Sequence, residues 1–82
     1  EFLVVLSSTN DQGVITFCER VRALVEGHEF RDGDNFIKLT VSLGYSLSGG
    51  TADEDARELV RDADHALYEA KKHGRNQFAK AQ

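Results

Sequence analysis

Residues 37–45 read Ile-Lys-Leu-Thr-Val-Ser-Leu-Gly-Tyr, with an apolar side chain at every second position. A period of two is typical of a β-strand that turns one face toward a hydrophobic core. Farther along the chain, apolar residues recur at the spacing of an amphipathic helix: Ala56, Leu59, Val60, Ala63, Leu67 and Ala70. The two patterns together predict a helix, over about residues 53–73, that packs on a strand.

The first half of the chain carries a second strand and a second helix. Residues 2–6, Phe-Leu-Val-Val-Leu, form an unbroken apolar run that is typical of a strand buried on both faces. A helix over about residues 11–26 follows, with its apolar stripe at Val14, Phe17, Cys18, Val21, Leu24 and Val25.

Short sequence signals mark the predicted ends of both helices. Thr9 and Gln12, and again Thr51 and Glu54, have the spacing of a capping box at a helix start. Gly27 and Gly74 are expected to end the two helices, because glycine is favoured just after a helix.

The remaining segments predict short strands. His28–Phe30 and Gln77–Ala79 are strand candidates, and Asp32-Gly33 marks a turn. The predicted order is β-α-β-β-α-β, so the expected fold class is α+β, an α/β sandwich-like arrangement. We expect a central, mostly antiparallel sheet flanked by helices, with residues 2–6 and 37–45 near its centre. No linker divides the chain, which indicates a single domain over residues 1–82.

The composition excludes several classes of protein. The 82 residues are 40% hydrophobic and 29% charged, which is globular and argues against a disordered chain. No apolar run reaches the length of a membrane span, and no signal peptide precedes the first strand. Ten basic and fourteen acidic side chains give a net charge of −4, so a nucleic-acid partner is not expected. The first residue is Glu1 rather than Met, which indicates a piece of a larger protein.

Cysteine and histidine do not indicate a metal or nucleophilic site. The chain has a single cysteine, Cys18, so it has no internal disulfide, which fits a reducing compartment. Cys18 lies on an apolar helix stripe, as a core residue would. His28, His65 and His73 share no close ligand spacing with it or with each other, so zinc is not expected.

The last twelve residues form a basic corner in this acidic chain. This segment contains no Asp or Glu, and its basic side chains are Lys71, Lys72, Arg75 and Lys80. Lys71 is predicted on the last helical turn, and a chain reversal at Gly74 would bring Arg75 back beside it. A lysine and an arginine that converge in this way suit a phosphate chain. Alternatively, the lysines complement the negative end of the helix dipole, and composition alone leaves both interpretations open.

Three segments resemble one family of proteins. Residues 63–76, Ala-Asp-x-Ala-Leu-Tyr-x-Ala-Lys-x-x-Gly-Arg-Asn, resemble the C-terminal signature of the GGDEF domains, the diguanylate cyclases. Residues 40–44 are similar to the family's T-V-S-I-G strand, and Glu1-Phe2 to the end of its G-G-D-E-F signature. Glu19–Arg22 also lies at the family's place on the following helix. The chain therefore resembles the C-terminal half of one GGDEF domain and starts inside that domain's signature. The resemblance implies a cyclase/polymerase-palm-like fold.

The resemblance implies an activity and a set of site residues. GGDEF domains condense two GTP molecules into cyclic di-GMP, a bacterial signalling nucleotide, and release pyrophosphate with the help of Mg²⁺. Each domain holds one GTP, so the implied assembly is a homodimer. The implied location is the cytoplasm, either for a free protein or for a cytoplasmic domain of a membrane-anchored parent. Lys71 and Arg75 would bind the substrate phosphates, and Arg20 resembles an arginine of the inhibitory product site. Glu1 is a candidate catalytic remnant of the signature, and the metal ligands are expected upstream of it.

Three functional hypotheses follow. The parent is an active diguanylate cyclase, of which this chain alone is expected to be inactive. Alternatively, it is a degenerate, non-catalytic GGDEF module that binds GTP or cyclic di-GMP as a regulator. A third possibility is a scaffold fragment with no ligand of its own. The residues that precede Glu1 would separate the first two, because an intact signature favours the enzyme.

Overall fold

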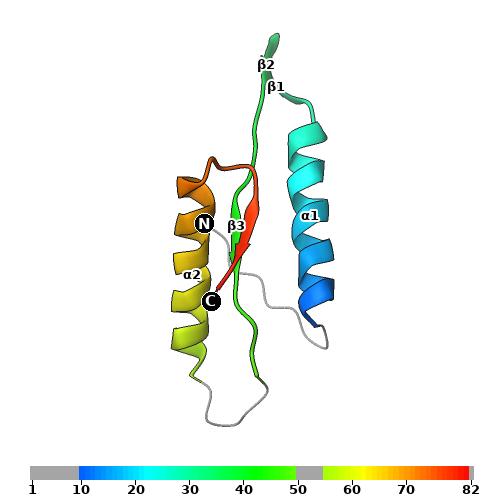
Figure 1. Cartoon of the computed structure of the whole chain (residues 1–82). Helices are drawn as coiled ribbons and strands as arrows, with labels where there is room; N and C mark the ends of the chain where they lie inside the picture. Colours follow the sequence, from blue (N-terminus) through cyan, green and yellow to red (C-terminus); the bar gives the residue numbers. More distant parts are fainter. Residues whose placement is uncertain (1–9, 50–54, 82) are drawn as a thin grey trace.

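The computed structural model describes residues 10–49 and 55–81 and has an α+β fold, as predicted (Figure 1). Its elements are α1 (Asp11–Gly27), β1 (Phe30–Asp32), β2 (Asn35–Ile37), β3 (Leu43–Tyr45), α2 (Ala56–Lys72) and β4 (Phe78–Lys80). The strand predicted over residues 2–6 lies outside the described residues. Both predicted helices are confirmed, with ends within three residues of the expected ones.

The ends of α1 differ in detail from the prediction. Its N-cap is Asn10, whose side-chain oxygen accepts from the backbone N–H of Gly13 at 2.9 Å, so the cap lies one residue after Thr9. Gly27 is the last helical residue rather than a left-handed cap, and His28 leaves the helix in an extended conformation. Leu24, which the periodicity placed on the core stripe, is 72% exposed.

The start and the stripe of α2 also differ from expectation. Its N-cap is Asp55, which accepts from the Arg57 N–H at 2.9 Å, whereas the predicted Thr51–Glu54 box lies outside the described residues. The side chains buried beneath the helix are Ala66 and Ala70. Val60 is 39% exposed, so the buried stripe is narrower and made of smaller residues than the pattern indicated.

The prediction of one continuous strand over residues 37–45 is wrong, because only Ile37, the last residue of β2, and Leu43–Tyr45 of β3 are in strands, whereas residues 38–42 are in none. β2 pairs with β1 in an antiparallel hairpin that extends beyond the helices, whereas β3 pairs with β4 (Figure 1). The two ends of the alternating stretch thus have different partners, and the apolar period does not produce one continuous ladder. Phe36, Ile37 and Leu39 consequently remain 62%, 41% and 44% exposed.

The hairpin turn lies one residue later than predicted. The last strand pair joins Asp32 to Asn35, which leaves Gly33 and Asp34 as the two loop residues. Gly33 has a φ of +64°, a conformation that glycine adopts without steric strain.

The predicted central, mostly antiparallel sheet stays a prediction, because its strand over residues 2–6 lies outside the described residues. The described strands form two two-stranded sheets, antiparallel β1–β2 and parallel β3–β4. β3 and β4 run parallel because α2 connects them and carries the chain back to the starting end, as a helical crossover does.

The β3–β4 pair separates the two helices (Figure 1). Successive side chains of β3 alternate between them. Tyr45 packs with Val14 and Cys18 of α1 in a buried cluster, which Leu43 and Phe78 extend. The intervening Gly44 and the following Ser46 face α2, where the Ser46 hydroxyl donates to the Leu59 carbonyl oxygen at 2.6 Å.

Gly44 allows β3 and α2 to approach more closely than any side chain would permit. A Cβ at this position would meet the Leu67 backbone nitrogen and the Ala63 carbonyl oxygen, and would lie 2.6 Å from Leu67 Cα. All of these are backbone atoms of α2, so no side-chain rotation relieves the overlap.

A polar contact ties the start of α1 to both strands. The Tyr45 hydroxyl donates to Asp11 Oδ1 at 2.9 Å, and Lys80 Nζ lies 3.3 Å from the same oxygen. The bond from Tyr45 and the charge of Lys80 lower the pKa of Asp11. Burial, together with the bond to Asp11, raises the pKa of Tyr45 to about 12.

We predict that Gly44→Ala destabilises the protein by about 3 kcal/mol, because the added methyl group must push α2 away from β3. Chemical denaturation measures the change. Gly27→Ala is the matched control, since a Cβ at Gly27 meets nothing within 4 Å, and it should alter stability by no more than about 1 kcal/mol. Equal effects of the two substitutions would contradict the close-approach explanation.

We predict that the Tyr45–Asp11 contact makes stability depend on pH at both extremes. The lowered Asp11 pKa contributes stability that is present above its unfolded pKa and is lost as the pH falls through the folded value. The raised Tyr45 pKa contributes stability that is lost between about pH 10 and pH 12. Tyr45→Phe should remove the alkaline loss in denaturation curves recorded across this range, whereas Tyr68→Phe, at a 61% exposed tyrosine, should retain it.

Candidate functional site

The C-terminal end of α2 is closed by a Schellman motif. The N–H of Gly74 bonds to the Lys71 carbonyl oxygen at 3.4 Å, and the N–H of Arg75 bonds to the Ala70 carbonyl oxygen at 3.0 Å. Gly74 has a φ of +118°, and its predicted role in ending the helix is confirmed. The motif turns the chain sharply between Lys71 and Arg75.

The backbone stays in left-handed conformations after Gly74. Arg75 and Asn76 have φ values of +62° and +50°, which are unusual for residues with a Cβ and carry a cost of about 1–3 kcal/mol each. The Gln77 side chain supports this loop, because its Nε2 donates to the carbonyl oxygens of His73 and Arg75 at 2.9 and 3.1 Å. Such strain persists only where surrounding contacts hold it.

Lys71 and Arg75 are both exposed at this end of α2, as the sequence predicted. Among the described residues, neither side chain forms an ion pair, so both cations are available to an external anion. Lysine provides a compact charge and arginine a planar fork of donors, a combination that suits phosphate groups. Their convergence on one ligand stays a prediction.

A polar network joins α1 to the loop that carries Arg75. Arg22 Nη1 donates to Glu26 Oε1 and to Asn76 Oδ1, each at 3.2 Å. Asn76 Nδ2 donates to the other Glu26 carboxylate oxygen and closes the triangle. Arg22 also donates two hydrogen bonds to the Glu19 carboxylate, from Nη2 at 2.7 Å and from Nε at 3.1 Å. The guanidinium is therefore held by three side chains.

The charges in this network stabilise one another. Bonds from Asn76 and Arg22 lower the pKa of Glu26, and the bond from Arg22 lowers the pKa of Glu19. The two carboxylates in turn raise the pKa of Arg22. All three groups are ionised near neutral pH, so the network is intact under ordinary conditions.

Sequence reasoning did not identify this network. The spacing of Glu19, Arg22 and Glu26 on one helix is a signal for i,i+3 and i,i+4 ion pairs. The partner Asn76 is 54 residues from Arg22, and no local pattern reports that contact.

Arg20, another predicted site residue, lies on α1 and not at the basic end of α2. Arg20 lies exposed on α1, and the described residues include no bond or ion pair that joins it to Lys71 or Arg75. Arg20 and Arg22 are two positions apart, so they face different sides of the helix. Glu1 lies outside the described residues.

The described residues show neither a metal cluster nor a reactive thiol. Within residues 10–49 and 55–81, no three His, Cys, Asp or Glu side chains gather closely enough to hold a metal ion. Cys18 is a buried member of the α1 core, as predicted, and burial raises the pKa of its thiol. Its environment is that of an inert structural cysteine.

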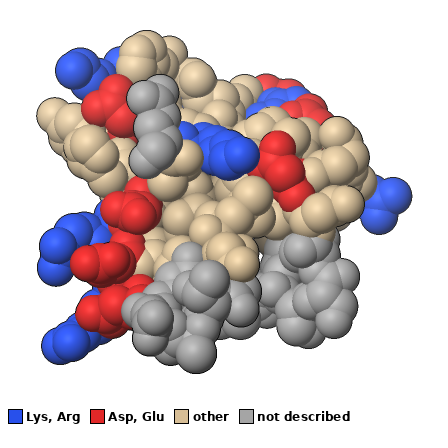
Figure 2. Space-filling model, turned by 60° about the horizontal axis from the view of Figure 1, so that its bottom comes forward, with Lys and Arg blue, Asp and Glu red and all other residues tan. Residues whose placement is uncertain are grey.

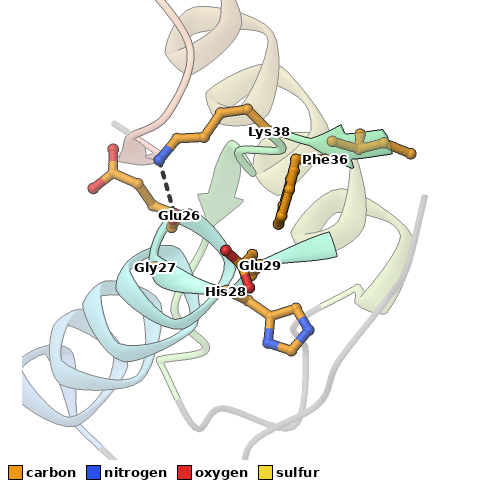
Figure 3. Close-up of a pocket in the computed structure, with 7 residues that line it drawn as sticks. Glu26, Gly27, His28, Glu29, Phe36 and Lys38 are labelled. Atoms are coloured by element: carbon orange, nitrogen blue, oxygen red, sulfur yellow. Dashed lines mark hydrogen bonds between the residues drawn. The ribbon is translucent and has the colours of Figure 1, made fainter. Parts of the chain in front are cut away.

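The surface has two open hollows. The first is at the end of α1 and beside the β1–β2 hairpin, with lining residues that include His28, Phe36 and Lys38. Figure 3 shows Lys38, which donates to the Glu26 carbonyl oxygen at 3.2 Å, reaching away from the ring of His28. The second lies between α2 and β4, against His65 and His73. Neither was predicted from the sequence.

The surface carries charges of both signs. In the described part of the face seen in Figure 2, Lys and Arg side chains lie among Asp and Glu side chains. That face offers no continuous basic surface of the kind that binds a nucleic-acid backbone. Of the two described helices, neither combines the length and the apolar character that a membrane crossing requires.

Comparison with known families shows which family the chain resembles. The family model described as "Diguanylate cyclase, GGDEF domain" matches residues 1–77. The match includes the Thr-Val-Ser-Leu-Gly segment that ends at Gly44, the α2 end with Lys71 and Arg75, and Asn76.

Curated relatives cover the same part of the chain. It is 38% identical over 76 residues to Diguanylate cyclase A of Treponema denticola, and 33% identical over 78 residues to Response regulator PleD of Caulobacter vibrioides. It is also 35% identical over 78 residues to Diguanylate cyclase DosC of Escherichia coli. Each match includes 93% of this chain but only 20%, 17% and 16% of the respective relative, so the chain spans a fifth or less of their length.

Proposed function

The chain belongs to the GGDEF family of diguanylate cyclases, and from this premise we propose that it is the C-terminal part of one GGDEF domain within a longer cyclase. The proposed reaction condenses two GTP molecules into cyclic di-GMP and releases pyrophosphate. The longer protein would act in the cytoplasm, either free or as the cytoplasmic domain of a membrane-anchored chain.

The observation that carries the proposal is the pair of exposed cations at the C-terminal end of α2. Lys71 and Arg75 have no anionic partner among the described residues, and both fall inside the segment that matches the family. A structural role for the charges, as complements of the helix dipole, would account for Lys71 and Lys72 on the last turn. It would not account for Arg75, which is placed beyond the helix in a strained conformation.

In the proposed mechanism, these two side chains bind the terminal phosphates of GTP. Lys71 acts as a point charge and Arg75 as a two-pronged donor to phosphate oxygens. Negative charge accumulates on the leaving pyrophosphate during transfer, and fixed cations beside it lower the barrier.

Magnesium is part of the proposed function only for the intact domain. The described residues provide no cluster that fits a metal ion, so we assign none of them as a Mg²⁺ ligand. The ligands would come from the part of the domain that precedes these residues, where Glu1 would be a neighbour of the signature carboxylate. Arg20 is proposed to contact the product at an inhibitory site, and a homodimer to bring two GTP molecules together.

We predict that Lys71→Ala and Arg75→Ala each lower GTP turnover in the full-length protein by roughly 10- to 150-fold, the effect of losing about 1.5–3 kcal/mol of charge-assisted bonding. Arg75→Lys should restore only part of the loss, because a point charge does not replace a fork. The control is Lys72→Ala, which removes an exposed lysine from the same helical turn and should leave turnover near the unsubstituted level.

Thermal melting of the same variants separates binding from stability. If the Lys71 and Arg75 variants melt early but keep normal turnover per folded molecule, the phosphate assignment is wrong. If the unsubstituted full-length protein binds GTP or cyclic di-GMP but forms no product, it is a regulatory module rather than an enzyme.

We predict that the 82-residue chain alone forms no cyclic di-GMP from GTP and Mg²⁺, because the proposed metal ligands are not among its residues. Chromatography of the reaction mixture would detect product. Its appearance, at a rate proportional to the concentration of purified chain, would refute the assignment of those ligands to the preceding half-domain.

A further inference from the structure

The loop that presents Arg75 requires support from outside itself. Gly74, Arg75 and Asn76 are three consecutive residues with positive φ, and two of them have a Cβ. The Schellman bonds fix Gly74 and the N–H of Arg75, but they do not reach Asn76. The left-handed conformation of Asn76 therefore depends on support beyond that motif, and the Asn76 side chain makes two such contacts.

Those contacts come from α1. The Asn76 amide accepts from Arg22 with its oxygen and donates to Glu26 with its nitrogen, so both ends of the amide are bonded to one helix. The Arg22 side chain is only 19% exposed, less than its partners Glu19 and Glu26 at 51% and 40%. An ordinary surface pair at i,i+4 supports only its own helix, whereas this one also holds a segment 50 residues away.

We propose that Arg22, Glu26 and Asn76 are positioning residues that hold the Arg75 loop in its left-handed conformation and so direct the Arg75 guanidinium toward its ligand. The identity of the ligand as the GTP phosphate chain rests on the proposed function. The claim that these residues hold the loop does not rest on it. None of the three touches the substrate in this scheme. They act by reducing the freedom that Arg75 would otherwise lose when it binds an anion.

The test uses four sets of variants in the full-length protein. Asn76→Gly removes the amide but keeps positive φ accessible. Asn76→Asp places a carboxylate against that of Glu26 and should repel it. The double substitution Glu26→Gln with Asn76→Asp exchanges donor and acceptor, retains the summed charge of the pair and allows the bond to form again. Glu29→Gln is the matched control, because Glu29 is exposed just beyond α1 and its ion pair, at 3.9 Å, is with Arg31.

The first measurement is hydrogen exchange at the backbone amides of residues 73–77, which needs no nucleotide. We expect exchange about tenfold faster in both single Asn76 variants, recovery in the double variant, and no change in the Glu29 control. Unchanged exchange in the single variants, or no recovery in the double variant, would overturn the proposal.

The second measurement is GTP affinity together with the melting temperature. Affinity should weaken roughly 3- to 30-fold in the single variants and recover in the double variant, with melting nearly constant. A purely structural role would lower melting and leave the affinity of the folded molecules unchanged, which would count against positioning. If GTP affinity does not recover in the double variant, the carboxylate at position 76 acts by repelling phosphate. That result would also contradict the positioning role.

The two proposals fail in different ways. If Lys71→Ala and Arg75→Ala leave GTP affinity unchanged, the phosphate assignment fails, and the exchange data alone decide whether the network holds the loop. If those two variants lose affinity but the network variants exchange faster and still bind GTP normally, the positioning role is wrong and the phosphate assignment stands.

Discussion

The contact between Gly44 and the backbone of α2 is the constraint on which the rest of this fold depends. With no side chain at Gly44, α2 lies directly against β3, and the small buried residues Ala66 and Ala70 maintain the same close packing. This proximity determines where the helix ends relative to the strands. Because α2 leads directly into β4, which pairs with β3, the loop between them is held at both ends. The basic end of α2 is thus anchored by a glycine that itself carries no chemistry.

The helices could be predicted from sequence because their signals are local. The apolar period, the cap residues and Gly74 act within a few positions of one another, and α1 and α2 lie where these signals indicated. The errors arose where a distant partner decides the outcome. Leu24 satisfies the period of α1 but has nothing to cover it in the described part of the chain. Residues 37–45 satisfy the period of a strand, but a ladder also requires a neighbour, and β2 and β3 have different ones.

The candidate site was predictable to a similar extent. The positions of Lys71 and Arg75 follow from the end of a helix and from a family signature, both readable from sequence. The contacts that hold Arg75 in place are not, because Arg22 and Glu26 belong to another helix. Asn76 was visible as the last residue of the signature, yet its role depends on a pairing that only the folded chain reveals. What the sequence offered was the tolerance of asparagine for left-handed backbone, which predicts a turn and no particular partner.

The Schellman motif and the Asn76 contact, two of the supports of the Arg75 loop, differ in physical kind. The Schellman motif uses backbone groups that the end of a helix leaves unpaired, so it forms wherever Gly74 follows α2. The contact of Asn76 with α1 uses ionised side chains, and it forms only when α1, β3 and α2 are packed together. The first therefore sets the local turn, and the second couples that turn to the completed fold. A cation placed by such coupling approaches its final geometry only in the folded domain, where an anion then finds its donors already ordered.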